Sequence, residues 1–135
     1  MTRPTEAGAT DSVSSPAAIR FSKELFKNAV EVPGAATDAI GAAARKAGSY
    51  VVVGVNERRP GSMGTLYNSL VFFGTDGSVL GVHRKLVPTL FERLVHTGGN
   101  GGGLTTYPTP YGALGGLICA ENTNSLARFT LLAQD

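Results

Sequence analysis

The sequence predicts an α/β fold. An alanine-rich helical pattern is followed at once by an apolar, β-branched run, and two more strand-like segments come next around a short turn. The 135 residues, 42% of them hydrophobic, are enough for one domain with its own core. We therefore expect one globular unit, a mixed sheet with helices on one face.

The first expected element is a disordered leader over residues 1–20. It is rich in Thr, Ser, Ala, Pro and Gly, and it holds too few large apolar side chains to offset the entropy lost on ordering. From Ser22 the pattern changes. Ser22 can cap a short helix in which Leu25, Phe26 and Ala29 share one face.

A second helix is predicted up to Ala47. Its apolar residues recur at helical spacing, at Ala36, Ile40, Ala43, Ala44 and Ala47. Arg45 and Lys46 lie in the last turn, where the helix dipole favours cations, and Gly48 supplies the stop. Because this apolar stripe is mostly alanine, the helix can pack closely on a sheet.

Three strands follow. Residues 50–55 are continuously apolar and β-branched, which is typical of a strand buried on both faces. Residues 65–73 and 79–85 predict two further strands, and the turn signal at residues 75–78 joins them into a hairpin. Lys85 therefore lies where a strand ends.

The last third of the chain begins with a loop and the glycine cluster at residues 98–103. That cluster lacks the spacing of a phosphate-binding loop, so a flexible loop is the simpler interpretation. Four elements are predicted around it: a helical turn at 91–94, strands at 104–107 and 114–118, and a helix at 125–133. Cys119 lies at the end of the second of these strands.

Charge and hydropathy exclude some classes of partner. The formal charge is +2, and the only dense basic groups are residues 58–59 and 83–85, so nucleic-acid binding has little support. No apolar run approaches the ~20 residues of a membrane-spanning helix, and the N-terminus lacks a secretory signal pattern. We expect a soluble chain in the cytoplasm.

Cys119 is the only cysteine, so it is either packing material or a reactive thiol. A position between a buried strand and a helix exposes a nucleophile and favours its anionic form. Lys85 also ends a strand, and ligands collect beyond the carboxyl ends of strands in open sheets. The two residues could converge there, with the ammonium favouring the thiolate.

Plainer interpretations stand beside this one. Cys119 could be an inert small hydrophobe, and Lys85 could be a solvated surface lysine. Glu92 and its neighbour Arg93 could form an ion pair on a helix surface. His83 and His96 have no metal-ligand partners in the sequence, so they are expected to be structural.

Three segments resemble successive signatures of the nitrilase branch of the carbon–nitrogen hydrolase superfamily, in order and spacing. They are His83-Arg84-Lys85-Leu86-Val87-Pro88-Thr89, Glu92-Arg93-Leu94 and Gly115-Gly116-Leu117-Ile118-Cys119-Ala120-Glu121-Asn122. Residues 53–58 and 64–73 also resemble that family, and the resemblance covers roughly residue 21 to the C-terminus.

The resemblance implies a mechanism. Cys119 would be the nucleophile, Lys85 the cation that steadies tetrahedral intermediates, and Glu92 a second glutamate for positioning and proton transfer. The backbone N–H of Ala120 would join Lys85 in stabilising developing negative charge. A nitrile would be converted to a carboxylic acid and ammonia, and no metal or organic cofactor is implied.

The resemblance also sets the expected extent of the fold. Nothing in residues 1–20 resembles the family's Phe-Pro-Glu-like segment, which carries its general base, and the family domain continues beyond the cysteine with further strands. Residues 21–135 would then form a partial domain, an incomplete αββα sandwich. The implied partners are a small nitrile or amide and further copies of the chain. The alternatives are an amidase of the same superfamily and a catalytically silent fragment.

Overall fold

Three antiparallel strands in the order β1-β2-β3 form the main sheet of the computed structural model, which describes residues 15–134. A second sheet is the two-stranded hairpin β4-β5. The helices and strands are α1 (Pro16–Asn28), α2 (Ala35–Ala47), β1 (Val51–Arg58), β2 (Leu66–Phe73), β3 (Val79–Arg84), β4 (Tyr107–Thr109), β5 (Gly112–Leu114) and α3 (Ser125–Leu132). Three short 3-10 helices lie between them: η1 (Leu90–Leu94), η2 (Gly101–Gly103) and η3 (Cys119–Thr123).

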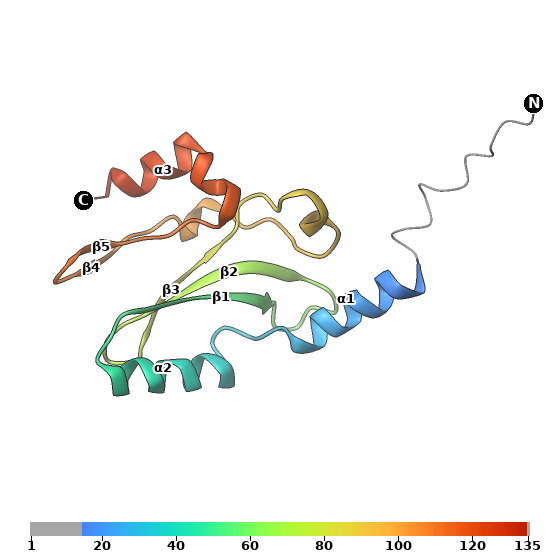
Figure 1. The fold of residues 1–135 in the computed structure, drawn as a ribbon, viewed down its shortest axis with the longest axis horizontal. Helices are drawn as coiled ribbons and strands as arrows, with labels where there is room; N and C mark the ends of the chain where they lie inside the picture. Colours follow the sequence, from blue (N-terminus) through green and yellow to red (C-terminus); the bar gives the residue numbers. More distant parts are fainter. Residues whose placement is uncertain (1–14, 135) are drawn as a thin grey trace, which may run out of the picture.

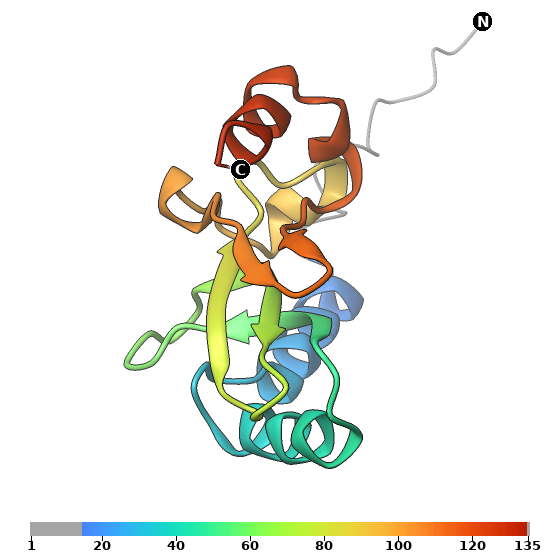
Figure 2. The same ribbon diagram turned by 90° about the vertical axis from the view of Figure 1, so that its left-hand side faces the viewer.

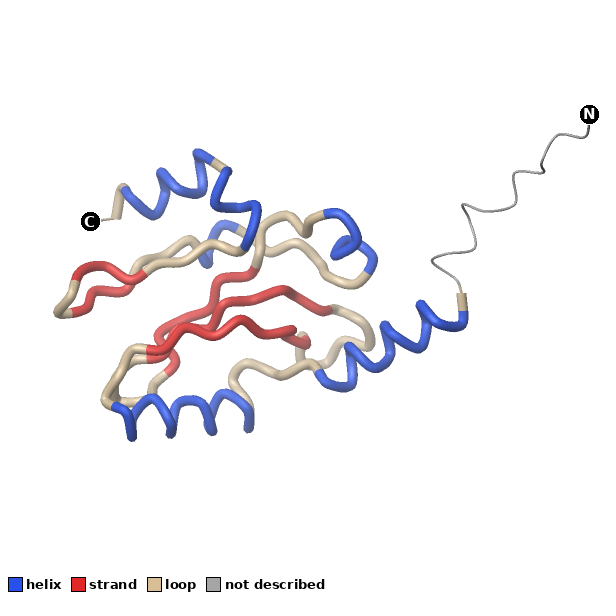
Figure 3. The backbone as a smooth tube through the Cα atoms, viewed as in Figure 1, coloured by secondary structure: helices blue, strands red, loops and turns tan. Residues whose placement is uncertain are grey.

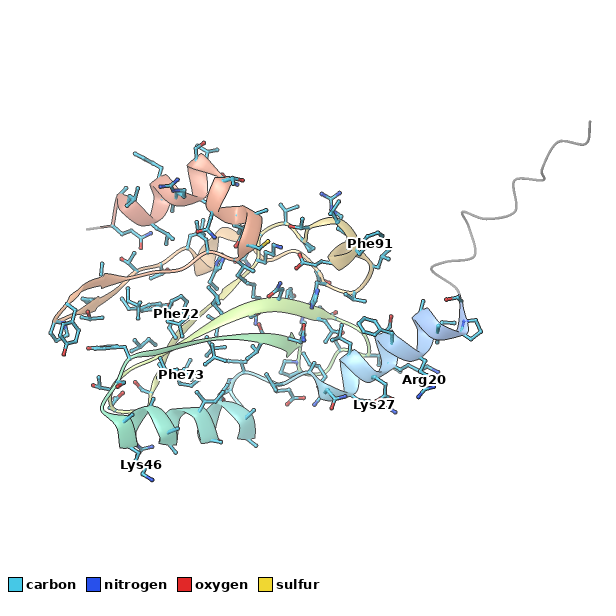
Figure 4. The ribbon with its side chains drawn as sticks, viewed as in Figure 1. Arg20, Lys27, Lys46, Phe72, Phe73 and Phe91 are labelled. Atoms are coloured by element: carbon cyan, nitrogen blue, oxygen red, sulfur yellow. The ribbon has the colours of Figure 1, made fainter. Side chains whose placement is uncertain are left out.

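The main sheet is covered on both faces. Helix α2 lies along one face, whereas β4, β5 and α3 lie on the opposite side (Figures 1 and 2). Neighbouring residues of β2 point to opposite faces of the sheet, because side chains alternate along a strand. Phe73 points toward α2 and Phe72 points toward β4 and β5 (Figure 4), and both are almost fully buried. The predicted restriction of helices to one face is therefore wrong.

The core beneath α2 is small and closely packed. Ala44, Val71 and Phe73 form its buried centre, with Ile40 and the inward valines of β1 packed around them. Gly41 of α2 lies directly against the backbone of the turn between β2 and β3, where an added Cβ would meet a carbonyl oxygen. Of the predicted alanine stripe, Ala44 is buried in this contact whereas Ala43 and Ala47 are exposed, and the closest approach is made by Gly41.

On the other face, the layer that leads to Cys119 rests on Phe72. The rings of Phe72 and Tyr107 lie 5.0 Å apart between centroids. Gly116 passes so close that an added Cβ would lie 3.0 Å from a methyl carbon of Leu70. The segment before Cys119 is thus held against the sheet by direct packing.

Two predictions about the sheet are wrong in detail. It is antiparallel rather than mixed, and the one parallel contact given for the described residues is an isolated bridge between Val30 and Glu57. Strand β1 lies at the edge, and its alternate residues face outward, so Val52 is 40% exposed. A continuous apolar run therefore did not mean burial on both faces.

The ends of the chain also differ from the sequence prediction. Helix α1 begins at Pro16 rather than at Ser22, because the Ser15 hydroxyl accepts a hydrogen bond from the Ala18 N–H and proline is favoured in a first turn. The last five residues of the expected leader are therefore helical, and its residues 1–14 lie outside the described part. None of the residues of α1 is buried, and the helix extends away from the sheet (Figure 1).

The two late strands are shorter than predicted and shifted. The predicted strands at 104–107 and 114–118 become a tight hairpin of three residues on each side. Residues 115–118 then run to Cys119 outside any ladder, as loop in Figure 3, because two glycines give little preference for a strand. Among residues 15–134, no helix is both long and apolar enough to cross a bilayer.

Candidate active site

Lys85 follows the last residue of β3 and is 1% exposed. Its backbone N–H donates to the carbonyl of Asn68 at 2.8 Å, which extends the pairing with β2 by one residue. Its ammonium donates to the Thr89 hydroxyl at 2.8 Å and to Glu92 Oε2 at 2.5 Å. Burying an ammonium is costly unless it is paired, and these two bonds supply the pairing.

Glu92, in η1, is the counter-ion of Lys85. Its Oε2 also accepts from the Thr89 N–H at 2.7 Å, and its Oε1 accepts from the Asn68 amide at 3.1 Å. The hydrogen bond from Lys85, followed by that from the Thr89 backbone, lowers the pKa of Glu92 below its ordinary value. Arg93 instead donates to the Pro88 carbonyl at 3.0 Å, so the plain interpretation of a surface Glu92–Arg93 pair is wrong.

Cys119 is exposed, and it is the first residue of η3. Its φ of 53° is in the left-handed region, which side-chain-bearing residues rarely adopt. The sharp turn presents the thiol to solvent, so the interpretation of Cys119 as buried packing material is wrong. Helix α3 starts only at Ser125, so the predicted effect of its N-terminus does not act directly at Cys119, because such effects fade within one turn.

Glu121 ties the Cys119 turn to the end of β3. Its Oε1 accepts from the Leu86 N–H at 2.6 Å, and its Oε2 accepts from the Ile118 N–H at 2.8 Å and from His83 Nε2 at 2.9 Å. Glu121 is 6% exposed. The sequence analysis missed its role, although a glutamate three residues into a turn that accepts from the preceding N–H is a known capping pattern.

His83 is fully buried opposite Glu121. Because a carboxylate only accepts hydrogen bonds, the proton of this contact belongs to His83 Nε2. Its other ring nitrogen, Nδ1, is buried and has no hydrogen-bond partner among the described residues. This fixed, enclosed position agrees with the structural role expected from the sequence.

A second buried carboxylate lies on the opposite face of the sheet. Glu57 is fully buried and accepts from the Ser69 hydroxyl at 2.7 Å and from two nitrogens of Arg84, the longer of these bonds being 2.8 Å. The Arg84 guanidinium also stacks 4.6 Å from the ring centre of Tyr67. The hydrogen bonds between Arg84 and Glu57 raise the pKa of Arg84. This cluster braces the strands but touches neither Cys119 nor Lys85.

The structure thus brings Lys85 and Glu92 together, and Glu121 joins the backbone of Ile118, before Cys119, to the backbone of Leu86, after Lys85. Lys85 Nζ makes its described hydrogen bonds to Thr89 and Glu92, and neither bond involves Cys119. The loop after Lys85 and the turn after Cys119 share the walls of one hollow of about 200 Å³, which Ala120 and Glu121 help to line.

His96 lies beside this group. Its Nε2 is 2.8 Å from Asn56 Oδ1, and burial lowers its pKa, with an opposing effect of Glu92 and a reinforcing one of Lys85. Within residues 15–134, no three His, Cys, Asp or Glu side chains gather closely enough to hold a metal ion. The chemistry offered by the described residues is that of a thiol, a buried ammonium and a carboxylate.

Known proteins share this sequence pattern. Residues 8–135 match the protein family described as carbon–nitrogen hydrolase. The chain is similar to "Nitrilase 3" from an unknown prokaryotic organism, with 49% identity over 109 residues, or 81% of this chain and 32% of that protein. It is 42% identical over 116 residues to "Bifunctional nitrilase/nitrile hydratase NIT4A" of Lupinus angustifolius, covering 83% of this chain and 32% of the relative. The chain therefore spans about a third of the length of these relatives.

A solved structure shares the fold. The crystal structure of a carbon–nitrogen hydrolase from Helicobacter pylori G27 is similar with a TM-score of 0.64 and 27% sequence identity, over 73% of this chain and 33% of that one. The predicted fold class, an α/β fold of this type, is confirmed by the match. The resemblance noted in the three sequence segments is confirmed by the family match and by the similar proteins.

Proposed function

We propose that this chain, which belongs to the carbon–nitrogen hydrolase family, carries the nucleophile of a hydrolase that acts on nitriles. The observation that supports this most is the exposed Cys119, on a turn that Glu121 joins to the backbone of Leu86, next to the Lys85 of the Lys85–Glu92 pair. A cysteine at a left-handed position costs about 1 kcal/mol relative to glycine. A reacting sulfur would explain why the side chain stands there.

In the proposed reaction the Cys119 thiolate adds to the nitrile carbon. A carbon–sulfur bond forms, one carbon–nitrogen bond order is lost, and the nitrogen takes up a proton to give a thioimidate. Water then adds and ammonia leaves, which gives a thioester. A second water releases the carboxylic acid and restores the thiol.

Lys85 and Glu92 have separate parts in this scheme. The Lys85 ammonium stabilises negative charge as it develops, together with the backbone N–H of Ala120. Glu92 holds that ammonium in place and is ionised at neutral pH, because hydrogen bonds from Lys85 and Thr89 lower its pKa. The ionised carboxylate can also accept a proton during the water steps, although its lowered pKa makes it a weak base.

Nitriles are preferred over amides as the proposed substrate class because of the relatives' names. Two similar proteins are called nitrilases, and NIT4A is called a bifunctional nitrilase and nitrile hydratase. The amidase alternative shares the same reacting groups. A parallel panel of nitriles and amides, assayed for ammonia release, separates the two substrate classes.

Covalent capture tests the proposal directly. The chain is incubated with a nitrile that carries an electron-withdrawing group, and its intact mass is measured. We expect Cys119 to gain the whole mass of the nitrile, because addition releases nothing, and Cys119→Ala to gain none. If the unmodified chain, with its fold intact, forms no adduct and releases no ammonia, the catalytically silent alternative is the better one.

A further inference from the structure

Glu121 touches the neighbours of both proposed reacting groups. It accepts a hydrogen bond of 2.6 Å from the N–H of Leu86, the residue after Lys85. It accepts another, of 2.8 Å, from the N–H of Ile118, the residue before Cys119. The third donor, His83, lies two residues before Lys85 in β3. One carboxylate therefore joins a turn and a strand end that are more than thirty residues apart, as the separation of 35 between Leu86 and Glu121 shows.

We propose that Glu121 is a positioning residue of this site, whose carboxylate fixes the turn carrying Cys119 to the strand end carrying Lys85. The inference rests on the proposed function, since it concerns the same two groups. Glu121 acts through its neighbours rather than on a substrate, because its side chain is only 5% exposed and its oxygens are occupied by three donors.

The connection depends on this one side chain. Among residues 15–134, no other hydrogen bond joins residues 83–88 to residues 115–124. Gly116 packs against the apolar side chains of Leu70 and Phe72 in β2, and apolar packing is not directional. Without the carboxylate, the turn would keep its place on the sheet but lose the bonds that set its distance from Lys85.

The chemistry of the contact requires a carboxylate of this length. Two oxygens with several acceptor positions serve three N–H donors. Glutamine has the same length, but its NH2 group would face at least one of these donors. Aspartate keeps the charge but is one methylene shorter, so it could not reach both backbone N–H groups. Glu121→Gln should therefore release one anchor while it changes the side-chain volume very little.

A double-mutant cycle tests the proposal, with iodoacetamide labelling of Cys119 in the folded chain as the readout. Lys85→Met should slow labelling about fivefold, because it removes a cation near the thiolate. Glu121→Gln should also slow it. In the Glu121→Gln chain, adding Lys85→Met should have less than about a twofold further effect, because the lysine no longer lies at a fixed distance from the thiol.

Glu57→Gln is the matched control. Glu57 is also a buried carboxylate with three hydrogen bonds, but it lies on the other face of the sheet. Both glutamine variants should lower the urea midpoint of unfolding. Only Glu121→Gln should change the response of labelling to Lys85→Met, so a general loss of stability cannot imitate the expected result.

The outcomes are distinct. If Lys85→Met slows labelling equally in the unmodified and Glu121→Gln chains, the positioning role is overturned while the proposed site stands. If Lys85→Met has no effect in the unmodified chain, the proposed site fails and the positioning role fails with it. If a variant does not fold, amide hydrogen exchange in the unmodified chain decides. The N–H groups of Leu86 and Ile118 should both be protected, and free exchange at either one would overturn the proposal.

Discussion

Lys85 and Glu92 form an ion pair in which Nζ lies 2.5 Å from Oε2, with the lysine side chain 1% exposed and the glutamate side chain 30% exposed. Removing one member of such a pair leaves a charge without its partner. Glu92→Gln should therefore lower the free energy of unfolding by about 1–3 kcal/mol, as measured by urea denaturation.

The exposed pair of Arg58 and Glu31 is the control for this change. Its side chains are 33% and 43% exposed, at a similar distance of 3.0 Å. Glu31→Gln should lower the free energy of unfolding by less than about 1 kcal/mol, because solvent screens the pair. Equal losses in the two variants would mean that burial of Lys85 adds nothing to the pair.

The same pair predicts how stability depends on pH. Hydrogen bonds from Lys85 and Thr89 lower the pKa of Glu92 from its ordinary value of 4.5, so the folded chain binds this proton more weakly than the unfolded chain. The stabilisation is therefore present above about pH 4.5 and is lost as the pH falls through the folded-state pKa. Urea midpoints should fall more steeply below that pH in the unmodified chain than in Glu92→Gln. Parallel curves would contradict the assignment of this acid transition to Glu92.

Because α2 contacts the turn at Gly77, replacing Gly41 by alanine should destabilise the chain, although helix propensity alone favours alanine. Alanine is the better helix former by about 1 kcal/mol, yet a Cβ at Gly41 would collide with the Gly77 carbonyl. Gly41→Ala should lower the free energy of unfolding by about 1–3 kcal/mol. Gly54→Ala is the control, since an added Cβ there meets nothing within 4 Å. A Gly41→Ala chain with a raised urea midpoint would refute this close contact.

The left-handed backbone of Cys119 predicts that replacing this residue by glycine stabilises the chain while it removes the thiol. Cys119→Gly should raise the free energy of unfolding by about 1 kcal/mol over Cys119→Ala, because glycine adopts a φ of 53° without a Cβ clash. Cys119 is exposed, so neither change removes buried surface. Thermal or urea unfolding of the two variants measures the difference, and a less stable glycine variant would mean that the turn relaxes to another conformation.

Local patterns predicted the parts of the fold that depend on local rules. Helix α2 ends at Gly48 in a left-handed conformation, as its stop signal indicated, and Lys85 follows β3 directly. The start of α1 was also readable, because Ser15 followed by Pro16 is a strong N-terminal signal. This signal lies within residues 1–20, whose composition predicted a disordered leader.

The buried carboxylate contacts could not be predicted in the same way. His83 and Glu121 are 38 residues apart, and Glu57 and Arg84 are 27 apart. Each contact depends on which strands pair, in which register, and on which layer covers each face. A single sequence carries no local signal for these choices, so a fully buried histidine and an ordinary surface histidine look alike in it.

The alternation of side chains along β3 has a consequence for the insertions and deletions that this domain can tolerate. On one face of the sheet, Arg84 contacts Glu57. On the other face, His83 contacts Glu121 and Lys85 contacts Glu92. One residue inserted between Gly81 and Lys85 would move each following side chain of the strand to the opposite face of the sheet. Nearer the turn, a bulge between Phe72 and Phe73 already takes up one extra residue in β3. Among homologues, chain length should therefore vary least over the last four residues of β3, where an insertion exchanges the two faces.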